Sequence, residues 1–157
     1  MKNLKDIISE KLIINKNIKI QKYNYHPNTF GELMDLIEKL IKERGNEANL
    51  NDIDVSKIDY MKKLFAYARS NFNGDISEWD VSNVTDMSFM FQNSKFNGDI
   101  SKWDVSNVKT MKWMFNGSEF TSKNGDISDW DVSNVTNMED MFDNSPLEKN
   151  PPKWYKE

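Results

Sequence analysis

The fold is decided by residues 72–91, which read FNGDISEWDVSNVTDMSFMF. Residues 96–115 carry this pattern again 24 positions later, and residues 123–142 carry it once more after a further 27. The longer interval contains the insertion Thr121–Lys123. Self-similarity at such a period is typical of repeat architectures, in which each unit buries its apolar side against the next. We therefore expect a stack of similar units.

Two degenerate copies flank these three repeats. Upstream, residues 50–65 hold apolar side chains in the same slots. Downstream, Leu147 and Trp154 keep the spacing of the phenylalanine and tryptophan in each repeat, which predicts half a repeat that closes the array. We divide the chain into an N-terminal helical cap over residues 1–49 and a repeat array over residues 50–157, together forming one compact unit.

Each repeat contains two local patterns. One set of apolar residues has the i, i+3, i+6, i+7 spacing of a helix face: Val84, Met87, Met90 and Phe91. A second set stands between turn residues and suits a short strand: Ile76, Trp79 and Val81. The Asn-Gly pair at residues 73–74 predicts a tight turn with positive φ. The fold class that we predict is α/β, as a short solenoid of about four coils with identical residues in columns.

The N-terminal part has a different pattern. Thr29 and Glu32 fit a capping box, and an apolar stripe follows at Leu33, Leu36, Ile37, Leu40 and Ile41. Gly45 stands at a natural C-cap, so a helix is predicted over residues 29–44. Residues 4–14 predict another short helix, and Ile18, Ile20 and residues 23–25 predict a strand or two. This part is expected to cap the first coil, because the ends of repeat stacks expose apolar surface.

The repeat motif carries a family resemblance. Phe-Asn-Gly-Asp-Ile-Ser-x-Trp-Asp-Val-Ser-Asn-Val, followed by Met-x-x-Met-Phe, resembles the BspA-like leucine-rich-repeat proteins, which include the Mycoplasma lipoprotein-associated repeat family. The resemblance covers residues 50–157 and implies a leucine-rich-repeat-like solenoid that binds proteins and is no enzyme. Many relatives are surface adhesins of bacteria or parasites, with signal peptides and long arrays. Short stand-alone members resemble cargo of phages and other mobile elements.

Composition excludes several kinds of chemistry. The chain has no cysteine and a single histidine, His26, so thiolate sites, histidine clusters and conventional triads are not expected. No apolar run is long enough to span a bilayer, and charged residues interrupt the place of a signal peptide. We therefore expect a cytoplasmic protein, in the host cell if a phage encodes it. A secreted parent that has lost its signal peptide is the alternative.

Residues that recur with the repeat are interpreted as structural. The methionines at helical spacing and the column Trp79, Trp103, Trp130 and Trp154 are predicted to be core rather than a metal site or a base-stacking platform. The recurring aspartates are predicted to cap turns and to accept backbone N–H bonds from a neighbouring coil. A catalytic site needs one asymmetric constellation, which the repeats lack. No catalytic residue, cofactor or metal is therefore predicted.

The informative residues are those that break the repeat. One slot between core residues holds Lys63, Phe89, Trp113 and Asp140 in successive coils. It lies off the apolar stripe and is expected to face solvent, with the two aromatic residues one above the other. The neighbouring slot holds Ser88, Lys112 and Glu139. The sequence predicts a partner-binding surface made of Phe89, Trp113, Lys63, Asp140, Lys112 and Glu139.

The charge distribution narrows the choice of partner. Residues 1–71 carry 13 basic and 10 acidic side chains, whereas residues 72–157 carry 8 basic and 15 acidic ones. An acidic array repels nucleic-acid phosphates but suits a basic protein surface. We expect one protein partner and neither nucleic acid nor membrane. The specific hypothesis is a phage or mobile-element inhibitor of a host defence complex, similar to an anti-CRISPR protein; the alternative is a surface-associated adhesion protein.

Overall fold

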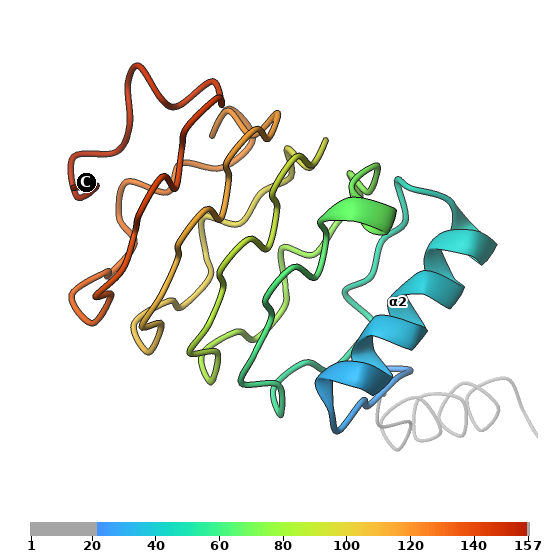
Figure 1. The fold of residues 1–157 in the computed structure, drawn as a ribbon. Helices are drawn as coiled ribbons and strands as arrows, with labels where there is room; N and C mark the ends of the chain where they lie inside the picture. Colours follow the sequence, from blue (N-terminus) through green and yellow to red (C-terminus); the bar gives the residue numbers. More distant parts are fainter. Residues whose placement is uncertain (1–21, 157) are drawn as a thin grey trace, which may run out of the picture.

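The computed structural model describes residues 22–156, and these form a row of coils that lie side by side with one helix at the end of the row (Figure 1). Four coils correspond to one another residue by residue: residues 49–68, 75–94, 99–118 and 126–145, which we number 1 to 4. The helix predicted over residues 4–14 and the strand predicted around Ile18 and Ile20 lie outside the described residues.

The helix at the end of the row is α2, which spans Phe30–Arg44 and confirms the prediction over residues 29–44. The Thr29 hydroxyl accepts a hydrogen bond from the Glu32 N–H at 3.2 Å, while the Glu32 carboxylate accepts from the Asn28 N–H. At the other end the Gly45 N–H donates to Ile41 and φ is 88°. Leu33, Ile37 and Leu40 are buried, so the apolar stripe faces coil 1.

The prediction of a leucine-rich-repeat-like α/β solenoid is wrong. Besides α2, residues 22–156 contain only a short 3₁₀ helix, η1, over Tyr67–Arg69, and β pairing is limited to isolated bridges. The segment 84–91, expected to be helical, is a series of turns, and residues 76–81 form no strand. The expected strand at residues 23–25 is reduced to one bridge between Tyr25 and Ile53. Each coil is therefore irregular chain.

The apolar residues that recur every three positions do not lie on a helix but at the ends of successive turns. In each coil an apolar residue donates its N–H to the carbonyl three positions before it, as Trp79 does to Ile76, Val84 to Val81 and Met90 to Met87. These are successive β-turns. Intervening N–H groups donate to a neighbouring coil, as Phe89 does to Lys112, or to an aspartate of the same coil, as Ser82 does to Asp80, so no i to i−4 ladder forms. A chain of turns and a helix thus share the same apolar period.

Aromatic columns run through the core of the stack. Neighbouring coils place Phe65, Phe91, Phe115 and Phe142 in one column, whose adjacent ring centroids are 5.6, 5.5 and 5.7 Å apart. Phe72, Phe96 and Phe120 form a second column. Because Phe120 keeps its place in the column, the insertion Thr121–Lys123 that follows it leaves the register intact.

The glycines of the Asn-Gly pairs allow the backbones of neighbouring coils to pack closely. We predicted positive φ at these turns, but the described glycines with positive φ are Gly45 and Gly117. A Cβ on Gly74 would lie 2.0 Å from the backbone oxygen of Ala48, the residue directly before coil 1. Glycine is required there because the neighbouring backbone occupies the position of any side chain.

Candidate functional site

The slot that breaks the repeat has an unusual backbone conformation. Lys63, Phe89, Trp113 and Asp140 have φ values of 62°, 61°, 59° and 51°, so we call them the left-handed column. For bulky side chains this region costs about 1–2 kcal/mol per residue. Coil pairing holds the backbone there, because the N–H groups of Lys63, Phe89 and Trp113 donate to Ser88, Lys112 and Glu139 of the following coil.

The two aromatic members of the column touch each other. The Phe89 and Trp113 rings have centroids 5.8 Å apart and an interplanar angle of 38°, so the predicted stacking of these neighbours is confirmed. Both side chains are half-buried rather than fully open to solvent. The indole nitrogen of Trp113 is shielded from solvent and has no hydrogen-bond partner. The exposed part of the aromatic pair is therefore apolar.

Two lysines of coil 1 lie against the aromatic pair. The ammonium groups of Lys62 and Lys63 are 5.8 and 5.3 Å from the centre of the Phe89 ring, within cation–π range. Lys63 also lies 5.5 Å from the centre of the Tyr67 ring. Tyr67 is 66% exposed, with a φ of 51°. The surface therefore extends to Lys62 and Tyr67, which the sequence analysis missed.

Tyr67 had a recognisable signal in the sequence. Its slot holds Asn93, Gly117 and Asn144 in the later coils, and these residue types are the ones that tolerate positive φ. A tyrosine in a slot of asparagine and glycine breaks the pattern in the same way as Phe89 and Trp113 do. Its position in the repeat therefore marks it as a candidate surface residue.

The far end of the surface is acidic. Lys112 and Glu139 form an ion pair at 2.6 Å between coils 3 and 4. The Glu139 side chain is exposed, and Asp140 beside it is half-buried. Lys112 and Glu139 offset each other, so Asp140 is the remaining acidic side chain of the surface at coil 4, where Lys156 lines the same pocket. Lys62 and Lys63 make the coil 1 end positive. The structure thus brings all six predicted residues together on successive coils.

The tryptophan and methionine columns are core, as predicted. Trp79, Trp103 and Trp130 are buried, and each indole nitrogen donates to a carbonyl of the preceding coil at 2.9–3.2 Å. Trp154 continues the column by donating to Ile127 at 2.9 Å. The methionines of coils 1 to 3 are fully buried. In coil 4 Met141 is buried and Met138 is half-buried.

The recurring aspartates form turns within their own coil. The carboxylates of Asp99, Asp104 and Asp126 each accept from the N–H and the hydroxyl of the serine two positions on. These bonds lower the pKa of each carboxyl. The predicted capping of turns is therefore confirmed. The bond that Asp75 accepts from the preceding coil comes from the side-chain amide of Asn49 at 3.1 Å, and not from a backbone N–H as predicted. Among residues 22–156, no three acidic or histidine side chains group closely enough to hold a metal ion.

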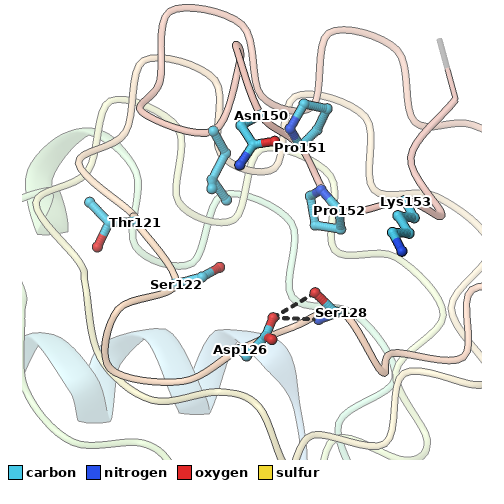
Figure 2. Close-up of a pocket in the computed structure, with 9 residues that line it drawn as sticks. Thr121, Ser122, Asp126, Ser128, Asn150, Pro151, Pro152 and Lys153 are labelled. Carbon is cyan, nitrogen blue, oxygen red and sulfur yellow. Dashed lines mark hydrogen bonds between the residues drawn. The ribbon is translucent and has the colours of Figure 1, made fainter.

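A pocket of about 340 Å³ lies beside the insertion, between residues 121–128 and the closing segment 147–153 (Figure 2). Figure 2 shows Ser122 and Asp126 on one side and Asn150, Pro151 and Pro152 across from them. Its one carboxylate, Asp126, is already bonded to Ser128. Lys153 is the other titratable side chain of the lining.

Comparisons with known proteins place the chain in a family. A family model described as "Mycoplasma protein of unknown function, DUF285" matches residues 34–154, which include most of α2 and all four coils. No curated protein and no solved structure matches the chain. Within the described residues, no helix has the length and apolar character needed to cross a bilayer. The chain belongs to the Mycoplasma DUF285 family, whose function is unknown.

Proposed function

We propose that this chain is a non-catalytic protein-binding module and that its binding surface is the left-handed column with its neighbours Lys62, Tyr67, Lys112 and Glu139. The observation that carries the proposal is the contact of Phe89 with Trp113 at 5.8 Å, at two positive-φ positions on the outside of a repetitive scaffold. Paired aromatic side chains with a charged rim are typical of interface hot spots.

The scaffold itself does not require these aromatics. The same slot accepts a lysine in coil 1 and an aspartate in coil 4 with similar φ, so neither packing nor backbone geometry selects for a large ring. Left-handed backbone disfavours bulky side chains, and strained residues of this kind cluster at functional sites. The resemblance of the motif to BspA-like repeat proteins also supports protein binding.

For the partner, we propose a protein with a basic surface inside the host cell, and more specifically a component of a defence complex that this chain inhibits. The excess of acidic residues over residues 72–157 supports a basic partner, since opposite charges steer association. This proposal predicts binding that weakens as salt concentration rises.

The test is affinity capture from host lysate with quantitative mass spectrometry, comparing the wild-type chain with a Phe89→Asn/Trp113→Asn variant. Asparagine is used because it tolerates positive φ, so the fold is expected to persist. The matched control is Glu78→Ala/Lys102→Ala, which removes two exposed side chains from the same coils without changing net charge. We expect a discrete partner retained by the control and lost by the asparagine variant; equal recovery by all three proteins contradicts the proposal.

A further inference from the structure

The binding surface has an order of charge that runs along the stack. The left-handed column reads Lys63, Phe89, Trp113 and Asp140 from coil 1 to coil 4. The adjacent column begins with Lys62 and ends with Glu139. The left-handed column is therefore basic at coil 1 and acidic at coil 4, with two aromatic side chains between. The adjacent column has the same order at its ends, with Ser88 and Lys112 between them, and its Lys112 is paired with Glu139.

When a second copy of the surface runs in the opposite direction, its acidic end faces the basic end of the first copy. A two-fold axis perpendicular to the stack, between Phe89 and Trp113, sets Lys63 opposite Asp140 of a second copy. The same rotation sets Phe89 opposite Trp113 of that copy. Interfaces of two-fold dimers are self-complementary in this way, because one patch meets itself.

The register fits over the full length of the surface. Adjacent coils are evenly spaced, since the core phenylalanines stand 5.6, 5.5 and 5.7 Å apart from coil 1 to coil 4. Because the four coils are equally spaced, the rotation places each coil opposite a coil of the second copy, and none is left unpaired. The insertion Thr121–Lys123 leaves this match intact, since Phe142 stacks on Phe115 at the same spacing as in the other coils.

We infer that the surface is a self-association site and that its occupant is a second copy of this chain in a two-fold dimer. The inference rests on the proposed function in one respect, because it concerns the same surface. A dimer hides the aromatic pair, so the protein partner has to compete with self-association. The surface is narrow, and interfaces of modest area are typical of weak and transient contacts.

The experiment exchanges the charges between the two ends. One variant is Lys62→Glu/Lys63→Asp and the other is Glu139→Lys/Asp140→Lys. Each new residue in the left-handed column is one that the column already holds elsewhere, so the backbone accepts it. The control is Glu78→Lys/Lys102→Glu, a charge exchange on exposed residues outside the surface. Self-association is measured by sedimentation velocity over a concentration series, with circular dichroism to verify folding.

We expect the wild type and the control to dimerise with rising concentration, and each surface variant alone to stay monomeric because like charges oppose each other. An equimolar mixture of the two variants is expected to restore a 1:1 dimer, since every opposed pair is then attractive. A wild type that stays monomeric, or a mixture that does not associate, overturns the inference. Partner capture is scored separately, so a monomer that still loses its partner through Phe89→Asn/Trp113→Asn leaves the proposed function standing.

Discussion

The indole nitrogen of Trp103 donates to the backbone carbonyl of Ile76 in the preceding coil at 3.2 Å, whereas the indole nitrogen of Trp113, ten residues on, has no partner. One tryptophan thus joins two coils through a buried hydrogen bond, and the other is shielded from solvent without one. The same residue type serves the stack in the first case and the surface in the second.

This difference predicts opposite responses to a tryptophan-to-phenylalanine substitution. Trp103→Phe leaves the Ile76 carbonyl buried without its donor, so we expect the free energy of unfolding to fall by about 1–3 kcal/mol. Trp113→Phe removes a donor that is already unpaired and is expected to leave stability unchanged or slightly raised. Urea denaturation of both variants measures the difference; a larger loss for Trp113→Phe would contradict this assignment.

Substitution of two glycines separates close packing from backbone freedom. Gly74→Ala would place a Cβ 2.0 Å from the Ala48 oxygen, so the variant is expected to unfold at a much lower temperature or to accumulate as insoluble protein. Gly31→Ala, in the first turn of α2 with its nearest atom at 3.9 Å, is the control and should gain up to about 1 kcal/mol. Thermal unfolding followed by circular dichroism tests both, and a stable Gly74→Ala protein would rule out the tight approach of coils 1 and 2.

Two phenylalanines that are two positions apart should differ sharply in their effect on folding. Phe91 is fully buried in the core column, so Phe91→Ala is expected to cost about 3–5 kcal/mol. Phe89→Asn removes a half-buried ring from a strained position, and we expect its free energy of unfolding to stay within about 1 kcal/mol of the wild type. Chemical denaturation distinguishes the two, and comparable losses would place Phe89 in the core.

The aspartate turns predict a loss of stability in acid. The hydroxyl and N–H of Ser106 hold the pKa of Asp104 below its value in the unfolded chain. Such a carboxylate stabilises the fold above the unfolded pKa, and this contribution disappears as the pH falls through the lower folded pKa. In Ser106→Ala, the pKa of Asp104 should rise and less stability should be lost on acidification. NMR titration of the Asp104 carboxyl carbon checks the shift; an unchanged pKa would assign it to another cause.

Much of the arrangement could be predicted from the sequence, because repetition reveals which residues stack. The bounds of α2, the burial of the repeated tryptophans and the contact of Phe89 with Trp113 all follow from spacing. The secondary structure of the coils could not be predicted in the same way, since apolar residues three apart suit a helix and a chain of turns equally. The positive φ of Phe89 and Trp113 could not be predicted either, because phenylalanine and tryptophan rarely adopt this conformation.

The direction of the hydrogen bonds between coils has an electrostatic consequence. Along the binding surface, N–H groups point from each coil to the next and carbonyls point back, as between Phe89 and Lys112 or Trp113 and Glu139. The peptide dipoles of this side therefore align along the stack, with the positive pole at coil 4 and the negative pole at coil 1, by the same physics as in a helix. Glu139 and Asp140 sit at the positive pole and Lys62 and Lys63 at the negative one, so the backbone itself favours the order of charge on the surface.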